Sequence, residues 1–477
     1  MIHEDSGKGG RSHGSHFRHK HFRHKHRLSG VTAGATLRLA ERISTSQFKT
    51  LPENAITVAK QCLLDYIGVT LAGMREPLTR ILLADIREAG GNPQASIFCE
   101  HDRATADQAV LVNGAAGHAH DYDDVHTDMT GHPTVPVAPV VLTLAEVCNS
   151  SGADLINAFA AGVDAECILG RAMGASHYAR GFHATGTLGS FGAAAAAARL
   201  YQLGSQATAR ALGIAGTQAS GLKSQFGTMV KPLHAGHAAQ TGLSAARLAK
   251  RGFESRTNIL EVGQGFAATQ SQGLDAARFD DAMLRDAYVP GICFKYHAAC
   301  YLTHSSIEAT RTLMQRHQLA AGDIDAVEIS VNEGHFGVCN IQAPASGLEA
   351  KFSLRFTAAM AMAGEDTAGI DSYTDALTQR PELVTLRDRV TVSAWEQPRA
   401  ESRVRMRVGG EWVEEDFNVA IPLTDLDLQW QKLSVKFHAL ADPLTGRDRA
   451  CAIEQFCRTL DTQTDLDPLF VLLRGQS

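Results

Sequence analysis

Apolar residues recur every three or four positions along most of the first three fifths of the chain. In the stretch that opens at Pro52, the residues Ile56, Ala59, Leu63 and Ile67 share one helical face, which is typical of a packed helix. Gly, Asn, Ser and Pro separate this stretch from others of the same kind. The pattern predicts helices near 51–73, 77–90, 104–118, 136–148, 152–170, 188–203, 237–250 and 275–286, with a short extended piece at 96–99.

The period of the pattern changes to two after about residue 320. Residues 326–331, 390–393 and 403–408 alternate between apolar and polar, as strands do. Gly409 and Gly410 then lead into a short strand that begins at Glu411, which predicts a hairpin with a two-residue turn. Further helices are expected at 301–316 and 350–363. These elements predict an antiparallel sheet with helices on one face.

The two patterns predict a fold class and a division of the chain. We expect a mainly α protein with a large all-helical domain at 34–290 and a smaller α+β lid domain at 291–422. The stretch 423–477 returns to a helical pattern and is expected to complete the helical domain. A length of 477 residues also exceeds what one hydrophobic core usually supports.

Residues 1–30 differ from the rest of the chain. They hold seven of the 21 histidines, and His-Phe-Arg-His-Lys occurs twice in tandem, at 16–20 and 21–25, without apolar periodicity. A metal-binding tail is one interpretation; a disordered histidine-rich tag outside the fold is the one we prefer. The tail carries seven Lys or Arg and two Asp or Glu, so the remaining chain is more acidic than the net charge of −6 indicates.

Composition and charge exclude several classes of partner. An acidic body is not suited to nucleic acid, and 44% hydrophobic with 20% charged residues is typical of a soluble globular protein. No apolar run approaches the roughly 20 residues that span a bilayer, so no membrane partner is expected. Nine scattered cysteines without a Cys-x-x-Cys pair, and no apolar signal-peptide core, favour a cytoplasmic location.

The densest cluster of chemically active side chains lies between Gly117 and Thr134. It holds four histidines and four acids directly after an alanine-containing apolar run. Charges beside buried surface are costly unless they pair or take part in chemistry. Three interpretations stay open: a divalent metal site, a solvated helix cap, or an acid/base loop in which Pro133 helps to place His132. A metal would use Asp121, Asp123, His126 and His132. No His-x-x-x-His spacing supports it, so we favour the acid/base loop and predict no metal.

Three more clusters combine basic and phenolic side chains. Tyr178, Arg180 and His183 precede an alanine-rich helix, whose first backbone amides can bind a carboxylate. Lys231 and His234 precede the helix predicted at 237–250, where Lys231 is either a solvated charge or a catalytic amine. The last cluster, Lys295 and His297, lies where the helical pattern gives way to the α+β pattern, and such junctions often hold ligand clefts.

Five motifs occur in a fixed order along the chain: His120-Asp121-Tyr122-Asp123-Asp124, Gly131-His132-Pro133, Phe182-His183-Ala184-Thr185-Gly186-Thr187, Lys231-Pro232-Leu233-His234-Ala235-Gly236 and Phe294-Lys295. In this order they resemble the MmgE/PrpD family, which includes 2-methylcitrate dehydratase, cis-aconitate decarboxylase and iminodisuccinate epimerase. The resemblance covers about residues 34–460. It implies a large helical domain with a smaller α+β lid, a homodimer, and no metal or organic cofactor. It also implies that Asp121, His132, His183, Lys231 and Lys295 line the active site.

Two departures distinguish the branches of the family. Thr134-Val135-Pro136 follows the His-Pro pair, where the dehydratase branch usually has Ser-Asp-Asn and the decarboxylase branch Ser-Gly. The decarboxylase branch also has a tyrosine in the second domain, whereas residues 331–349 contain none. The resemblance is therefore greatest to the iminodisuccinate epimerase branch.

We accordingly predict an epimerase that removes and returns a proton next to a carboxylate of a small polycarboxylate of the iminodisuccinate type. Such chemistry needs a positioned base and cations that stabilise the developing charge. Lys231 is the first candidate for the base, and Tyr178 for the second acid/base group, with His132 and Asp121 beside them. The expected substrate-binding residues are His183, Arg180, His234, Lys295 and His297. A lyase of the same family and a non-catalytic binding protein are the alternatives.

Overall fold

A computed structural model describes residues 34–396, 398 and 400–475, and within them the predicted mainly α fold class is confirmed. The histidine-rich segment 1–30 lies outside the described residues, so the prediction of a disordered tag stays a prediction. The first part of the described chain is helical: α1 (Ala35–Thr45), α2 (Glu53–Gly73), α3 (Pro77–Ala89), α4 (Ala106–Gly117), α5 (Thr134–Cys148), α6 (Gly152–Met173), α7 (Ala175–Ala179), α8 (Ala184–Leu200), α9 (Ser205–Gln218), α10 (Val230–Lys250), α11 (Phe266–Gln270) and α12 (Ala276–Met283). Two short strands, β1 (Ala95–Ser96) and β2 (Arg103–Ala104), form an antiparallel pair between α3 and α4.

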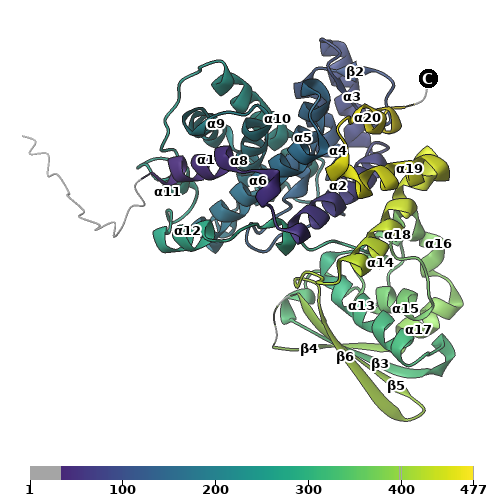
Figure 1. Ribbon diagram of the computed structural model, residues 1–477. Coiled ribbons are helices and arrows are strands. Elements are labelled where there is room, and N and C mark those ends of the chain that lie inside the picture. The colour runs from purple at the N-terminus through teal and green to yellow at the C-terminus, as the bar shows by residue number, and fades with distance from the viewer. Residues whose placement is uncertain (1–33, 397, 399, 476–477) are drawn as a thin grey trace, which may run out of the picture. The chain divides into compact units, whose positions relative to one another are not determined.

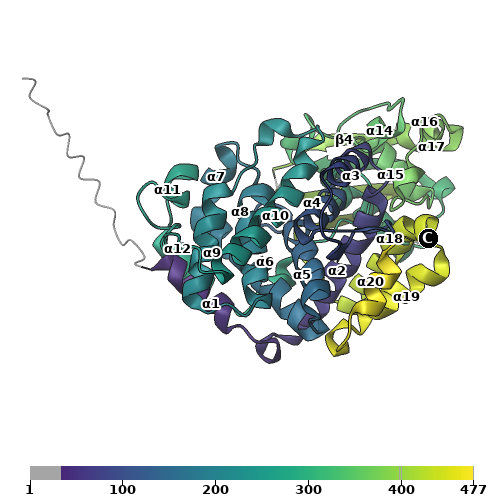
Figure 2. The ribbon, with the colours of Figure 1, turned by 90° about the horizontal axis from the view of Figure 1, so that it is seen from above.

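Helices α6, α8 and α10 form the centre of the helical part (Figure 2). Nearly every residue of α8 is buried, including the alanine run that ends at Ala198. Small side chains let these helices approach closely. A Cβ atom at Gly236 of α10 would lie 2.2 Å from the Leu111 carbonyl oxygen of α4. Glycine at this position therefore allows the contact that brings the start of α10 toward the end of α4.

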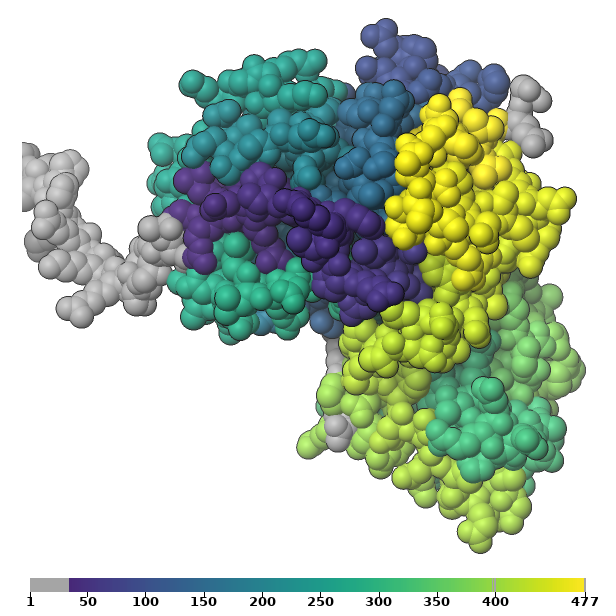
Figure 3. Space-filling model, viewed as in Figure 1, coloured from purple at the N-terminus to yellow at the C-terminus, as the bar shows by residue number. Residues whose placement is uncertain are grey.

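The C-terminal helices lie against the N-terminal part of the chain (Figures 1 and 3). These helices are α18 (Leu426–Thr445), α19 (Arg447–Arg458) and α20 (Asp467–Leu473). Lys436 of α18 forms a buried ion pair with Asp65 of α2, at 2.6 Å. Trp430, Leu433 and Phe437 belong to the same hydrophobic cluster as the helical part.

Helix α2 is long and apolar enough, by length and composition, to span a bilayer, contrary to the expectation that no such run exists. Of its most apolar window, 83% is buried inside the protein. It packs against α4 and α18. These contacts describe a core helix.

The α+β part contains a four-stranded sheet in the order β4-β3-β5-β6, from β3 (Ile324–Val331), β4 (Val390–Ala394), β5 (Glu401–Val408) and β6 (Glu411–Asn418). Ile329, Val404 and Met406 pack with α13 (Tyr301–Arg316) and α15 (Leu354–Met362) on one face (Figure 1). The other face is charged: Arg405 pairs with Glu328 across the strands at 2.7 Å. The shorter helices here are α14 (Gly347–Ala350), α16 (Asp375–Thr378) and α17 (Pro381–Asp388).

The structure differs from the predicted elements in three respects. β4 is parallel to β3, whereas an antiparallel sheet was expected; the helical crossover between the two strands makes the parallel arrangement possible. Helices α1 and α9 were not predicted, and neither has a side-chain N-cap that would mark its start. Helix α10 begins at Val230 instead of 237, because Pro232 is tolerated in a first helical turn. Lys231 and His234 therefore lie within the helix.

Candidate active site

The acidic motif forms an irregular loop between α4 and α5. The chain leaves α4 at His118, and Asp121 has a left-handed backbone conformation, with φ of 51°. Such a conformation is uncommon outside glycine, although aspartate is among the residues that tolerate it. Backbone hydrogen bonds of 2.9 Å in each direction join Val125 to Cys293. This bridge brings the loop beside the segment that carries Lys295.

Three nitrogen groups converge on a single oxygen of Asp121. Lys231 Nζ lies 2.7 Å, Lys295 Nζ 3.1 Å and His132 Nε2 3.3 Å from Asp121 Oδ1. The Lys295 ammonium also donates to the Asp121 backbone carbonyl. Burial opposes ionisation of Asp121, but Lys295 and Lys231 outweigh it and hold the pKa of this carboxyl well below its usual range. Two ammonium groups so close together form a place where an anion is strongly favoured.

Asp123 connects two imidazole rings behind Asp121. His118 Nδ1 lies 2.8 Å from Asp123 Oδ1, and His132 Nδ1 lies 3.0 Å from Asp123 Oδ2. Burial opposes the charge on Asp123, but His118 and His132 lower its pKa well below the usual range. Burial lowers the pKa of His118 to about 4. With Nδ1 of His132 beside Asp123, its Nε2 faces Asp121 and the cavity and is available for proton transfer.

A second group of acids lies deeper in the core. Asp124 accepts a hydrogen bond of 2.5 Å from the Thr134 hydroxyl, and burial followed by the charge of Asp65 raises its pKa to about 8. Burial also raises the pKa of Asp65 to about 6, although Lys436 opposes the shift. Both oxygens of Glu166 are buried without a hydrogen-bond partner, and burial raises its pKa well above its usual range. Burial therefore favours the protonated forms of Asp124 and Glu166, and Lys436 offsets only part of the same effect at Asp65.

The start of α8 supplies a third wall of the site. His183 precedes the helix, and its backbone N–H donates to the Gly221 carbonyl at 3.0 Å. Its Nδ1 lies 3.1 Å from His234 Nδ1, so one of these nitrogens donates and the other accepts. Burial, together with the nearby His118, strongly lowers the pKa of His183. Phe226 packs edge-on against the His183 ring at a centroid distance of 4.9 Å.

These groups enclose a cavity of about 300 Å³. Its polar lining consists of Asp121, Thr130, His132, Tyr178, His183, Lys231, Lys295 and Tyr301. A second cavity of about 390 Å³ shares Asp121, Lys295 and Tyr301 with it. Six of the nine residues predicted from the sequence, namely Asp121, His132, Tyr178, His183, Lys231 and Lys295, thus lie around one cavity, and His234 contacts His183 from behind.

Two predicted substrate-binding residues do not join this cavity. Arg180 is exposed and donates to the Thr269 carbonyl at 3.3 Å, because the last turn of α7 directs it away. His297 is fully buried between Thr367 Oγ1 at 2.7 Å and Glu308 Oε1 at 2.9 Å, so both of its nitrogens are engaged. It lines only the second cavity.

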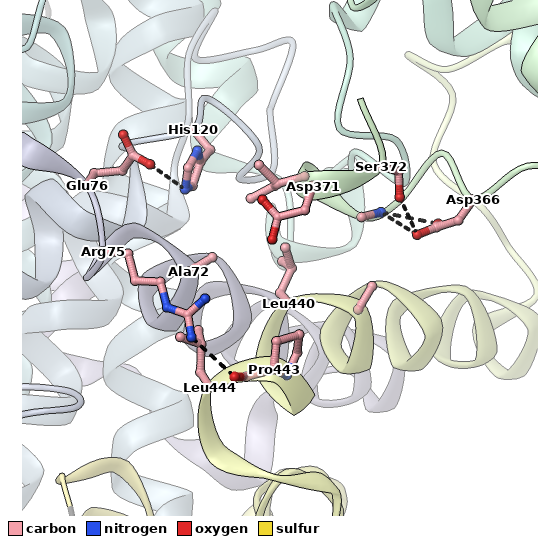
Figure 4. Close-up of a pocket in the computed structure, with 13 residues that line it drawn as sticks. Ala72, Arg75, Glu76, His120, Asp366, Asp371, Ser372, Leu440, Pro443 and Leu444 are labelled. Carbon is pink, nitrogen blue, oxygen red and sulfur yellow. Dashed lines mark hydrogen bonds and ion pairs between the residues drawn. The ribbon is translucent and has the colours of Figure 1, made fainter. Parts of the chain in front are cut away.

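The sequence pattern did not single out His118, Phe226 or Tyr301. His118 stands in the same motif as His120, and the local spacing alone gave no reason to choose between them. His120 lies 3.6 Å from Glu76, in a cavity between α2, α18 and the 366–372 loop (Figure 4), and also lines the second cavity. Only the loop conformation distinguishes the two rings.

The residues that could bind a metal differ from those that the sequence suggested, because His118 takes the place of His126. The ligand atoms of His118, Asp121, Asp123 and His132 lie within 4.8 Å of one another, whereas His126 bonds to the Tyr288 carbonyl at 3.1 Å instead. This set fits a divalent cation poorly. Two ammonium groups already contact Asp121, and each Asp123 oxygen faces an imidazole nitrogen.

Comparison with known proteins gives matches over most of the chain. The MmgE/PrpD N-terminal domain matches residues 37–278, and the MmgE/PrpD C-terminal domain matches 297–462. Cis-aconitate decarboxylase of Aspergillus terreus (strain NIH 2624 / FGSC A1156) is 26% identical over 480 residues, which cover 93% of this chain and 97% of the relative. The cis-aconitate decarboxylases of Homo sapiens and Mus musculus are 26% and 25% identical, with 90% of this chain and 92% and 91% of the relatives covered. The order of the motifs, the convergence of their side chains and both domain matches lead to one conclusion: the chain belongs to the MmgE/PrpD family.

Proposed function

We propose that the protein is a carboxy-lyase that decarboxylates a small unsaturated tricarboxylate of the cis-aconitate type. The observation that carries this proposal is the convergence of Lys231, Lys295 and His132 on one carboxylate oxygen, that of Asp121. A site built this way suits a substrate with several carboxylates. The names of the relatives, which are cis-aconitate decarboxylases, favour this reaction over epimerisation.

The proposed reaction breaks one carbon–carbon bond and forms one carbon–hydrogen bond. Carbon dioxide leaves, and the electron pair of the broken bond spreads into the conjugated system of the remaining substrate. Lys231 and Lys295 stabilise the negative charge that develops there. A proton from an acid in the cavity then reaches carbon, so the product holds one carboxylate fewer.

His132 is the acid best placed for that proton. Asp123 holds its Nδ1, which leaves Nε2 directed to the cavity. Lys231 lies 2.7 Å from the Asp121 carboxylate, and in this proposal it supplies positive charge instead of acting as the base that the sequence suggested.

Epimerisation is the second candidate, and a specific feature favours it. Tyr178 and His132 line the same cavity, which gives the two acid/base groups that removal and return of a proton require. Thr134 after the His-Pro pair and the absence of tyrosine in 331–349 also distinguish the chain from the decarboxylase branch.

Incubation with cis-aconitate, a methylcitrate-type hydroxyacid and iminodisuccinate in deuterated water, followed by NMR and mass spectrometry, separates the candidates. We expect release of carbon dioxide and one deuterium on carbon in the product. Deuterium in otherwise unchanged iminodisuccinate would instead establish the epimerase, and loss of water would establish a dehydratase. No change in any substrate would favour the non-catalytic alternative.

A further inference from the structure

The second cavity, of about 390 Å³, extends from the shared residues Asp121 and Lys295 toward the α+β part of the protein. Residues 298–300, Leu348, Lys351 and Phe352 line it there. A molecule held at Lys295 therefore borders the cavity of Lys231 and His132 on one side and the second cavity on the other. The far wall of this second space carries one cation, Lys351.

Lys351 differs from the other lysines around the site in its pairing. Lys231 and Lys295 contact Asp121, and Lys436 contacts Asp65. Among the residues that the structure describes, no carboxylate lies within ion-pair distance of Lys351, and its ammonium lies 5.4 Å from the centre of the Tyr373 ring. A half-buried ammonium without an anion is an unfavourable arrangement unless a ligand supplies the anion.

The backbone fixes Lys351 at this wall. It follows α14 directly, and its carbonyl accepts a hydrogen bond of 2.9 Å from the Cys300 N–H. Burial lowers the pKa of Lys351, opposed by the more distant charges of Asp371 and Glu76. An anionic ligand in the cavity would relieve this penalty.

We propose that the second cavity is a subsite for a distal carboxylate of the substrate, and that Lys351 is the residue that recognises it. The reacting carboxylate would lie at Lys231 and Lys295, and the carbon chain would pass Phe352. This inference rests on the proposed function for the identity of the reacting group. What it adds is that a ligand must carry a second negative charge, which Lys351 binds.

The test measures binding of inert ligands to the full-length protein, so it does not depend on turnover. Propane-1,2,3-tricarboxylate, glutarate and butyrate form a series that loses one carboxylate at each step, and ligand-observed NMR titration gives their affinities. We compare the wild type with Lys351→Met and Lys351→Arg. The matched control is Lys250→Met, because Lys250 also lies over a tyrosine ring, Tyr201 at 4.3 Å, but far from both cavities.

We expect Lys351→Met to weaken tricarboxylate and glutarate binding roughly 10- to 100-fold, the usual range for loss of a hydrogen bond to a charged group. Butyrate binding should stay within about twofold, Lys351→Arg should bind nearly as the wild type, and Lys250→Met should not differ. Equal weakening of all three ligands, or no weakening, overturns the subsite; if Lys351→Met does not fold, Lys351→Gln gives the same comparison. Charge-dependent binding without release of carbon dioxide from cis-aconitate would refute the decarboxylase and leave the subsite standing.

Discussion

Two groups of acids have opposite affinities for protons, although Asp123 of the first group and Asp124 of the second are adjacent in the sequence. Asp121 and Asp123, which we call the cavity acids, have lowered pKa values because lysines and histidines surround them. Asp124 and Glu166, which we call the core acids, have raised pKa values because burial acts on them and, among the described residues, no cation forms an ion pair with either. The comparison teaches that neighbouring cations, and not burial itself, distinguish an acid of the site from an acid of the core.

The largest expected effect comes from removing a cation of the cavity acids. Lys231→Ala should lower kcat roughly 10²- to 10⁴-fold, because it removes charge that stabilises the transition state. Its melting temperature should stay close to that of the wild type, since Asp121 keeps Lys295 as a cation partner at 3.1 Å. Steady-state kinetics with cis-aconitate and thermal unfolding give both quantities.

Two further variants sharpen this prediction. Lys231→Arg keeps the charge and should recover roughly tenfold of the lost rate; a rate as low as that of the alanine variant would assign proton transfer to Lys231 instead.

Lys436→Ala removes the cation beside Asp65, and both partners are buried. That change should lower the free energy of unfolding by about 3–5 kcal/mol.

The next effect compares neighbouring residues directly. Asp123→Asn should lower kcat roughly 10²-fold, because an amide no longer holds the Nδ1 proton of His132 as a carboxylate does. Asp124→Asn should change kcat less than about threefold, because Asp124, with a pKa of about 8, is mostly protonated near neutral pH and resembles an amide. Similar losses in both variants would contradict the division into cavity and core acids.

The sequence indicated which residues belong to the candidate site better than it indicated where their side chains point. Asp121, His132, His183, Lys231 and Lys295 come from five motifs, and the structure brings them together. They were chosen because these motifs resemble the MmgE/PrpD family, and their residue types are those that carbon-acid chemistry uses.

Directions depend on local conformation that a sequence pattern does not contain. His118, at the end of α4, reaches Asp123, whereas His120, two residues further along the loop, lies beside Glu76. Arg180 points away because of the turn that ends α7. The same limit applies to the fold. The strand at 390–394 was expected from its alternation, but its parallel pairing depends on the crossover that precedes it.

A smaller effect concerns the pH dependence of stability. The pKa of Asp124 is about 8 in the folded protein against about 4 in an unfolded chain. Because the folded value is raised, the contribution of this group is fully present below pH 4 and is lost as the pH rises through 8. Denaturant unfolding at pH 5 and pH 7 gives the free energy of unfolding of both proteins. The value for Asp124→Asn, relative to that of the wild type, should rise by about 1 kcal/mol for each pH unit. A constant difference between the two proteins would show that the core acid is ionised in the folded state.

The smallest expected effect is that of metal removal, for which we expect no change in rate or melting temperature. His118, Asp121, Asp123 and His132 place four ligand atoms close together, so a metal is the direct competitor of the acid/base interpretation. The lysines favour the acid/base interpretation. A divalent cation at Asp121 would be repelled by two ammonium groups that already lie 2.7 and 3.1 Å from the Asp121 oxygen. Exhaustive dialysis against a chelator, followed by kinetics, tests this. Loss of activity that a single divalent metal restores would make the cavity acids metal ligands, and their low pKa values would then serve coordination and not proton transfer.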